Sequence, residues 1–214
     1  MTTIIDYGVG NLFSLVCSLE KIGERVEITS NADRIMQAER LILPGVGAFE
    51  DAANKLKESC LDKAVLSKAA TGTPILGICL GMQMLFDKSY EFGEHQGLGL
   101  IPGSIKPIAP VIGDLKSPQM GWNSLIFPAD KPKHPIFKYV NQGDYVYFVH
   151  SYAAMQCEDS VTALTEYGAL LTAAACRDNV CGTQFHPEKS GSVGLNILRA
   201  FAEFRPNQSH GGIL

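Results

Sequence analysis

A cysteine between two glycines is the first candidate for chemistry in this sequence. Gly77-Ile78-Cys79-Leu80-Gly81 follows an apolar segment and precedes a stretch, 82–86, that we expect to be helical. A strand, a tight turn and a helix in this order form a nucleophile elbow, in which the glycines leave room for the turn. The start of a helix also favours a thiolate. Cys79 is therefore a candidate nucleophile, although a buried apolar cysteine in a glycine-rich turn would give the same pattern.

A second segment, Gln184-Phe185-His186-Pro187-Glu188, offers a base and a residue to orient it. Residues i and i+2 of a strand project from the same face, so His186 and Glu188 can meet. Pro187 cannot donate to a strand ladder, which puts the pair at a strand end, where open α/β sheets carry their active sites. We predict that His186 is the general base and acid for Cys79 and that Glu188 orients it. A histidine beside a proline is also commonly a turn or surface residue, and His150 is a rival base.

Attack of a thiolate on an amide carbonyl creates an oxyanion, which needs fixed N–H donors. The elbow supplies one donor, the backbone N–H of Leu80. We expect a second from Gly45, Val46 and Gly47, which follow Pro44 at the end of a short apolar run. Considered in isolation, this segment fits an ordinary glycine-rich connection between a strand and a helix equally well.

These residues must lie at the ends of neighbouring strands to act together. The chain alternates between short apolar runs and longer amphipathic segments, which predicts an α/β fold with a three-layer open, mostly parallel (mixed) sheet and helices on both faces. Residues 93–144 lack a helical pattern, and we expect short, partly antiparallel strands that extend the sheet. We expect one domain over 1–204 and a flexible tail over 205–214. The predicted strands are 3–7, 25–28, 40–43, 73–78, 145–149 and two or more within 173–185, and the predicted helices are 12–22, 50–70, 82–86 and 194–204.

Composition excludes several classes of function. The formal net charge is −4, and Lys and Arg are nowhere concentrated enough to neutralise a run of phosphates, so we expect no nucleic-acid partner. The sequence shows no run of about 20 apolar residues and no secretion signal, so we expect a cytoplasmic protein with no membrane role. The six cysteines are widely spaced, which favours free thiols. Cys176 and Cys181 are the closest pair, but no zinc-site spacing surrounds them, so we expect no metal.

Taken together, the elbow, the Pro-Gly-rich loop and the His-Pro-Glu segment resemble the class I glutamine amidotransferases, in the same order along the chain. Within that family the sequence is most similar to the glutaminase subunits of imidazole glycerol phosphate synthases, and the resemblance covers residues 2 to about 204. It rests on segments 6–12, 43–49, 77–86, 97–103, 120–123, 149–152 and 184–191.

The resemblance implies a two-part enzyme in histidine biosynthesis. One subunit hydrolyses L-glutamine to glutamate and ammonia through a cysteine thioester. The ammonia then passes through a channel to a (β/α)8-barrel cyclase subunit, which makes imidazole glycerol phosphate and aminoimidazole carboxamide ribonucleotide. This implies a heterodimer without a cofactor, whose isolated glutaminase subunit we expect to be nearly inactive.

Position matching to the family implies two further groups of residues. The first group contacts the bound glutamine: Gln83, Glu91, Ser151 and Tyr152. The second faces the cyclase: Asn11, Trp122, Tyr147 and Lys189. Read from the sequence alone, the two aromatic residues are equally core residues and the lysine a solvated charge.

The sequence departs from the family pattern at two places. Ser117-Pro118-Gln119 lacks an expected basic residue, and Ala153 replaces an aromatic one, so we expect differences on the docking face. Three other readings stay open at this level. The chain is alternatively a glutaminase for a different synthase, a standalone cysteine hydrolase or peptidase, or a catalytically silent scaffold protein.

Overall fold

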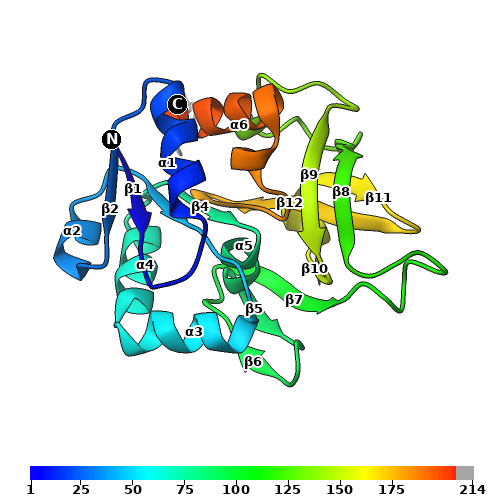
Figure 1. Ribbon diagram of the computed structural model, residues 1–214, viewed down its shortest axis with the longest axis horizontal. Helices are drawn as coiled ribbons and strands as arrows, with labels where there is room; N and C mark the ends of the chain where they lie inside the picture. The colour runs from blue at the N-terminus through cyan, green and yellow to red at the C-terminus, as the bar shows by residue number, and fades with distance from the viewer. Residues whose placement is uncertain (206–214) are drawn as a thin grey trace, which may run out of the picture.

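The central element of the fold is a seven-stranded sheet. In the computed structural model, which describes residues 1–205, the strand order is β11-β12-β13-β4-β3-β1-β2 (Figure 1). The five strands from β13 to β2 are parallel, and β12 and β11 add antiparallel partners at one edge. The mixed, mostly parallel sheet is therefore as predicted. Its strands are β1 (Thr2–Ile5), β2 (Val26–Thr29), β3 (Leu41–Leu43), β4 (Ile75–Ile78), β11 (Val161–Glu166), β12 (Leu170–Arg177) and β13 (Val180–Thr183).

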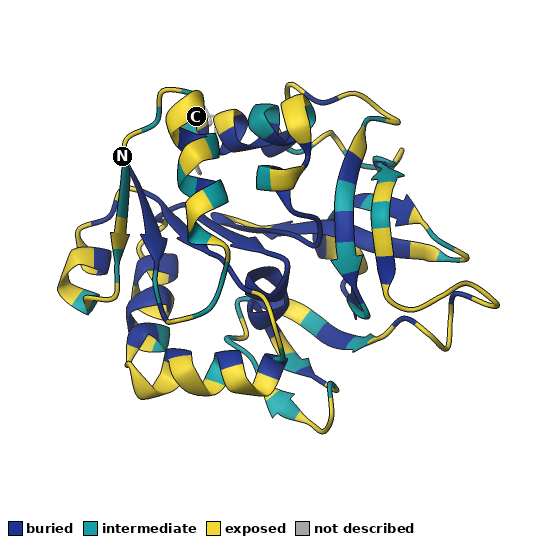
Figure 2. Ribbon diagram, viewed as in Figure 1, coloured by how far each residue is buried: buried dark blue, intermediate teal, exposed yellow. Residues whose placement is uncertain are grey.

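Helices cover both faces of this sheet, because neighbouring strand residues bury their side chains on opposite sides. Ile5 packs into a core with α2 (Ala32–Met36), α3 (Phe49–Glu58), α4 (Leu61–Ala70) and α5 (Leu80–Met84). Ile4 packs into a second core with α1 (Leu12–Lys21) and α6 (Gly191–Glu203). Figure 2 shows the result: the central strands are buried, and the helices expose only their outer faces. No helix within residues 1–205 is long and apolar enough to cross a membrane.

The single helix predicted over 50–70 is wrong, because two helices occupy this stretch. The hydroxyl of Ser59 donates to the carbonyls of Lys55 and Leu56, which ends α3. Cys60 then adopts a left-handed conformation with φ of 57°, which turns the chain before α4 begins at Leu61. A glycine at this position would have indicated the end of a helix in the sequence, but a cysteine does not.

The expectation that residues 93–144 extend the main sheet is also wrong. Their strands join two smaller sheets. The first has the order β10-β7-β5-β6, and the second pairs β8 with β9 in antiparallel register. Apolar alternation identifies strands but not their partners, which depend on contacts between distant segments. The strands are β5 (Phe86–Ser89), β6 (His95–Gln96), β7 (Ile101–Pro107), β8 (Gln119–Ser124), β9 (Tyr145–His150) and β10 (Tyr152–Met155).

Three short 3-10 helices complete the described chain: η1 (Pro135–Phe137), η2 (Glu158–Ser160) and η3 (Pro187–Lys189). Of these, η3 follows β13 directly and so helps to position the candidate base. The predicted flexible tail lies outside the described residues apart from Arg205.

Candidate active site

Three candidate segments meet at the carboxyl ends of neighbouring parallel strands. Cys79 follows β4, the loop from Pro44 to Gly47 follows β3, and Gln184 to His186 follow β13. Strand β4 lies between the other two in the sheet. The order of the strands therefore brings together residues that are more than a hundred positions apart in the sequence. They meet at the edge where open α/β sheets carry their active sites.

Cys79 occupies a tight turn between β4 and α5. Its φ of 55° and ψ of −111° lie outside the regions that side chains favour, which is the strain expected of a nucleophile elbow. The turn requires glycine at Gly81, where an added Cβ would lie 1.8 Å from the carbonyl oxygen of Leu43. The predicted strand, turn and helix are therefore present, although α5 begins at Leu80, two residues earlier than expected.

The thiol of Cys79 is nearly buried among polar groups. Its side chain is 8% exposed. The amide of Gln184 donates to its sulfur at 3.7 Å, and the carbonyl of Val149 lies 3.9 Å from the same atom. Gln184 was not among the predicted site residues, although it begins the segment that carries the candidate base.

His186 and Glu188 lie side by side, with 2.8 Å between Nδ1 of the ring and Oε1 of the carboxylate. The local structure that brings them together is not the strand that we predicted. Strand β13 ends at Thr183, and the chain then turns into η3, of which His186 is the N-terminal capping residue. The hydroxyl of Ser190 donates to the carbonyl of His186, and the N–H of His186 donates to the carbonyl of Tyr147. These bonds fix the backbone on which the ring is mounted.

The charge state of His186 suits a partner of a thiolate. Burial by itself lowers the pKa of His186, but the interactions with Cys79 and Glu188 outweigh burial and raise the pKa to about 9. Within residues 1–205, Nε2 of the ring has no hydrogen-bond partner. The ring is therefore held through Nδ1 and leaves Nε2 free for proton transfer.

His150, the rival base, has a different role. Its ring is held on both sides, by the carbonyl of Tyr152 at Nδ1 and the side chain of Gln119 at Nε2, each at 2.9 Å. Burial lowers its pKa to about 4, so the ring is neutral near pH 7. With both nitrogens engaged, His150 serves to hold the segment around Tyr152 rather than to move protons.

A cavity of about 320 Å³ opens beside Cys79 and His186. All four residues matched to glutamine binding line it, together with Val46, Gly47 and Leu80 of the predicted oxyanion site. Gln83 donates to the carbonyl of Tyr152, and Glu91 accepts the N–H of Phe49 at 2.6 Å, so both side chains are held by the fold. The lining residues are Val46, Gly47, Cys79, Leu80, Gln83, Glu91, Pro118, Val149, His150, Ser151, Tyr152 and His186.

The loop from Pro44 to Gly47 is held by Tyr7, which lies in segment 6–12 of the resemblance but was not among the predicted site residues. Its hydroxyl donates to the carbonyl of Pro44 at 2.6 Å. An added Cβ on Gly45 would lie 2.9 Å from this hydroxyl and 2.7 Å from the backbone nitrogen of Gly81. The loop therefore packs directly against the elbow, with Val46 and Gly47 toward the cavity and Gly45 beneath them.

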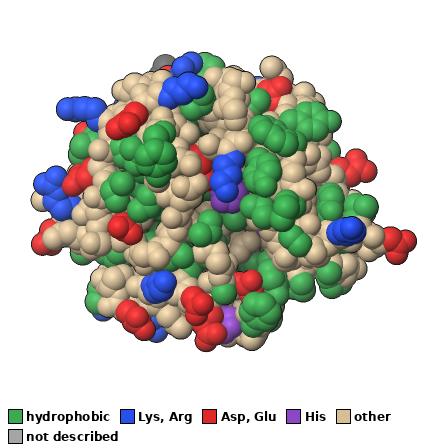
Figure 3. Space-filling view, viewed as in Figure 1, with side chains coloured by type: hydrophobic (Ala, Val, Ile, Leu, Met, Phe, Trp, Pro, Cys, Tyr) green, Lys and Arg blue, Asp and Glu red, His purple; other side chains and the backbone are tan. Residues whose placement is uncertain are grey.

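Two of the four residues matched to the cyclase interface pack together at the surface. The rings of Trp122 and Tyr147 meet edge to face at a centroid distance of 6.2 Å, and Lys189 extends its ammonium over Tyr147. Trp122 is 55% exposed, so it is not a core aromatic residue. Asn11 is also exposed, but its side chain caps α1 through Ser14. In Figure 3, hydrophobic side chains gather over β8 and β9 beside a central hollow.

The two departures from the family pattern lie in different environments. Ala153 is fully buried and packs against Ile108 and Leu171. Gln119 is 2% exposed and bonded to His150, and Pro118 lines the cavity. Ala153 is therefore not a surface residue, whereas Ser117 and Pro118 are exposed just before β8.

Within residues 1–205, one group of side chains has the composition of a metal site. It consists of His134, Cys176 and Cys181, and it includes none of the residues around the cavity. The spacing of residues near the two cysteines gives no sign of this group, because the histidine is 42 positions from Cys176.

Comparisons with known proteins agree with this geometry. Residues 3–203 match the family model for glutamine amidotransferase class-I. The chain is 48% identical over 206 residues to a protein named imidazole glycerol phosphate synthase subunit HisH from Wolinella succinogenes, covering 95% of this chain and 99% of that one. It is also 48% identical to the protein of the same name from Carboxydothermus hydrogenoformans, with the same coverage.

Solved structures show the same fold at low sequence identity. The structure of PurLQS from Thermotoga maritima matches with a TM-score of 0.73 and 20% identity, covering 94% of this chain and 97% of that one. The glutaminase domain of CTPS from Trypanosoma brucei matches with a TM-score of 0.64 and 13% identity, covering 96% of this chain and 95% of that one.

Proposed function

The chain belongs to the class I glutamine amidotransferase family, and from this membership we propose that it is the glutaminase subunit of an imidazole glycerol phosphate synthase. Near-full-length relatives at 48% identity carry the name of that subunit, which supports the choice among synthases. The single observation that carries the chemistry is the pairing of His186 with Glu188 at 2.8 Å, beside a cavity that also holds Cys79.

The reaction begins with attack by Cys79 on the side-chain amide of L-glutamine. Because the pKa of His186 is raised to about 9, the ring is an imidazolium at neutral pH and stabilises the neighbouring thiolate. The attack forms a carbon–sulfur bond and an oxyanion. The N–H of Leu80 and the loop of Val46 and Gly47 are proposed to bind that oxyanion, and the lining of the cavity by all three residues supports this.

Collapse of this intermediate breaks the carbon–nitrogen bond. His186 gives its proton to the departing nitrogen, so ammonia leaves and a thioester remains on Cys79. The ring, now neutral, takes a proton from water as the water attacks the thioester, and glutamate is released. Glu188 keeps the ring in one orientation through both steps.

Four residues that line the cavity are proposed to hold the glutamine. Glu91 is a carboxylate at the cavity wall, and it suits the α-amino group of the substrate. Ser151, Tyr152 and Gln83 also line the cavity, where backbone groups suit the α-carboxylate. These four residues are thus proposed to fix the amino-acid end and to leave the amide toward Cys79.

A second, smaller space suits the exit of ammonia. Its volume is about 10 Å³, and Val46 and His186 border both this space and the glutamine cavity. A volume of this size is close to that of one water-sized molecule. Asn11 lies at its outer side, so we propose that ammonia leaves past this residue toward a partner.

The proposed partner is a (β/α)8-barrel cyclase that docks on one exposed face. This docking face consists of Met120, Trp122, Tyr145, Tyr147 and Lys189. Along β9, buried residues alternate with more exposed ones, so Tyr145 and Tyr147 point to the same face. On this face Tyr147 lies opposite Trp122 of β8. Exposed aromatic residues and Met are enriched at protein interfaces, which supports docking here.

The proposed setting is the cytoplasm. All six cysteines are free thiols, which is usual for proteins of reducing compartments.

The experiment that tests the function is glutamate release from L-glutamine, with Cys79→Ala as the blank. The chain is assayed alone, with a matching cyclase, and with the cyclase and its nucleotide substrate. Activity that appears in the complete mixture and is lost in the variant supports the proposal. Full activity of the chain alone would favour a standalone hydrolase, and no activity in any mixture contradicts the proposed function.

A further inference from the structure

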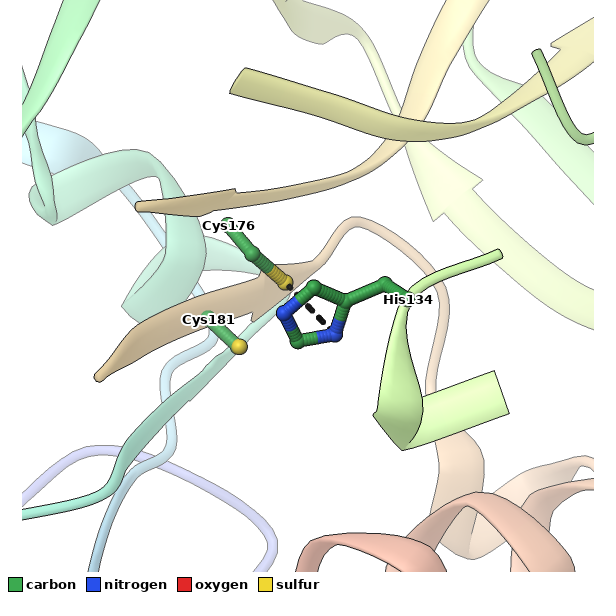
Figure 4. A group of neighbouring side chains, drawn as sticks. All are labelled: His134, Cys176 and Cys181. Atoms are coloured by element: carbon green, nitrogen blue, oxygen red, sulfur yellow. Dashed lines mark hydrogen bonds between the residues drawn. The ribbon is translucent and has the colours of Figure 1, made fainter. Parts of the chain in front are cut away.

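A cluster of soft ligands lies within the core beneath α6. Cys176 of β12 and Cys181 of β13 are direct partners across the antiparallel pair, and His134 reaches them from the loop that begins η1 (Figure 4). Cys181 is fully buried and Cys176 is 9% exposed. The three residues come from two distant parts of the chain, and no step of the glutaminase reaction uses them.

The spacing of their ligand atoms fits a tetrahedral metal site. Zinc–sulfur bonds of about 2.3 Å and zinc–nitrogen bonds of about 2.05 Å put neighbouring tetrahedral ligands about 3.5–3.8 Å apart. The sulfur of Cys176 lies 3.6 Å from Nδ1 of His134, and one ligand atom from each residue falls within 4.8 Å of the others. Small rotations of side chains suffice to close the remaining difference.

Charge selects the kind of ion. Two thiolates and a neutral imidazole carry a charge of −2, so a divalent cation gives a neutral site, and a buried neutral site avoids the cost of desolvating a net charge. A monovalent soft cation such as Cu⁺ would leave a negative charge in the core. Two sulfur ligands and one imidazole also disfavour Mg²⁺ and Ca²⁺, which prefer oxygen.

A hydroxyl lies beside the proposed ligands. The hydroxyl of Thr162 lies 3.7 Å from the sulfur of Cys176, and it suits a hydrogen bond to a metal-bound thiolate.

We propose that His134, Cys176 and Cys181 bind one Zn²⁺ ion, with solvent as the fourth ligand. The ion joins the hairpin of β12 and β13 to the segment around η1, which packs on α6. The ring of His134 also contacts that of Phe204, which follows α6, at a centroid distance of 5.4 Å. The proposed site therefore ties the end of α6 to the sheet, and its role is structural.

The site is distinct from the catalytic cysteine. Cys181 pairs in register with Leu76, three residues before Cys79, which corresponds to about 10 Å along extended chain. Zinc bound by the proposed site therefore does not need Cys79. Substitutions can therefore distinguish zinc bound by Cys176 and Cys181 from zinc bound by Cys79.

The test measures zinc bound per chain. The full chain is stripped with a chelator under reducing conditions and dialysed against buffered Zn²⁺, and metal is measured by atomic emission. Cobalt is used in parallel, because thiolate ligands give charge-transfer absorption. We expect one equivalent of zinc in the wild type, in Cys79→Ala and in Cys17→Ser, which removes an exposed thiol elsewhere. Cys181→Ser and His134→Gln should weaken binding by more than about 100-fold, above the range for residues that only support a ligand.

Thermal unfolding gives an independent readout. Zinc that binds only the folded chain raises Tm with concentration, and this rise should persist in Cys79→Ala and disappear in Cys176→Ser. Two results would overturn the proposal. One is zinc binding that is lost in Cys79→Ala and retained in Cys176→Ser. The other is a reduced wild-type chain, still folded by circular dichroism, that takes up no zinc and gives no cobalt–thiolate absorption.

Discussion

The hydroxyl of Tyr7 donates a 2.6 Å hydrogen bond to the carbonyl of Pro44, the residue that opens the loop over the candidate oxyanion site. The donor lies just beyond the end of β1, and the acceptor follows β3, its neighbour in the sheet. Burial raises the pKa of Tyr7, and the charge of Cys79 raises it further, so the hydroxyl keeps its proton and stays a donor. The loop is thus tied to the sheet by a buried bond.

The first prediction concerns this bond. Tyr7→Phe leaves the carbonyl of Pro44 without its donor, at a cost of about 1–3 kcal/mol. We expect kcat for glutamine hydrolysis by the complex to fall about 10-fold, with a smaller change in KM, because the loop binds the oxyanion more than the substrate. Tyr139→Phe is the matched control, since that hydroxyl donates to Glu203 at the surface. Equal effects of the two variants would contradict the role given to Tyr7.

The second prediction concerns the residue that orients the base. Glu188→Gln keeps a hydrogen-bond acceptor for His186 but removes its charge. We expect kcat to fall about 10²-fold. We also expect the high-pH limb of the kcat/KM profile to move to lower pH, because Glu188 contributes to the raised pKa of His186. Glu203→Gln is the control, as that carboxylate pairs with Lys138 on the surface. An unchanged pH profile in Glu188→Gln would count against the assignment.

The third prediction is a dependence of stability on pH. The pKa of His186 rises from 6.5 to about 9 on folding, so the contribution of its charge to stability is complete below about pH 6.5. That contribution is lost as pH rises through about 9, with a slope of up to about 1.4 kcal/mol per pH unit between these values.

Urea unfolding at several pH values measures this effect. The free energy of unfolding of the wild type should exceed that of His186→Gln most at about pH 6, and the difference should shrink by about pH 9.5. In a Cys79→Ala background the change with pH should be smaller, because Cys79 is one of the groups that raise the pKa of His186. A difference that stays constant across this pH range would disprove the coupling.

The fourth prediction tests the docking face. Trp122 is 55% exposed and packs edge to face against Tyr147, so it is suited to be a central contact of the interface. Trp122→Ala should weaken binding to the cyclase by about 30-fold or more, as expected for a contact worth about 2 kcal/mol, and should leave Tm nearly unchanged. Leu66→Ala is the control, because Leu66 is an exposed apolar residue on α4. Isothermal titration calorimetry with the cyclase distinguishes the two, and similar affinities for both variants would place the interface elsewhere.

Much of this site could be predicted from the sequence because its signals are local. The glycines around Cys79 and the proline between His186 and Glu188 each restrict the backbone within a few residues. The mostly parallel sheet could be predicted from the alternation of strands and helices. Even so, the two side chains of the His-Pro-Glu segment meet through η3 rather than through a strand.

The features that sequence reasoning missed depend on contacts between distant segments. Tyr7 reaches Pro44 across 37 positions, and His134 reaches Cys176 across 42. The strands within residues 93–144 were expected to extend the main sheet, because a strand pattern does not identify the partner of the strand. The break at Cys60 lacked the glycine that would have marked it.

The last prediction concerns the close packing that allows the elbow to form. A Cβ at Gly81 would lie 1.8 Å from the carbonyl oxygen of Leu43, so Gly81→Ala must displace either β3 or the start of α5. A Cβ at Gly72 meets nothing within 4 Å, although its φ of 79° is also in the left-handed region. Gly72→Ala therefore isolates backbone strain, which costs about 1–2 kcal/mol.

Both variants are compared by urea unfolding and by glutamine hydrolysis in the complex. Gly72→Ala should lose about 1–2 kcal/mol of unfolding free energy and keep its activity, since strain at a distant turn leaves the site in place. Gly81→Ala should lose more than about 3 kcal/mol, in the range of overpacked buried sites, and lose activity in whatever fraction still folds. Equal losses of stability in the two variants would mean that the elbow has room for a side chain, and the strained conformation of Cys79 would then need another cause.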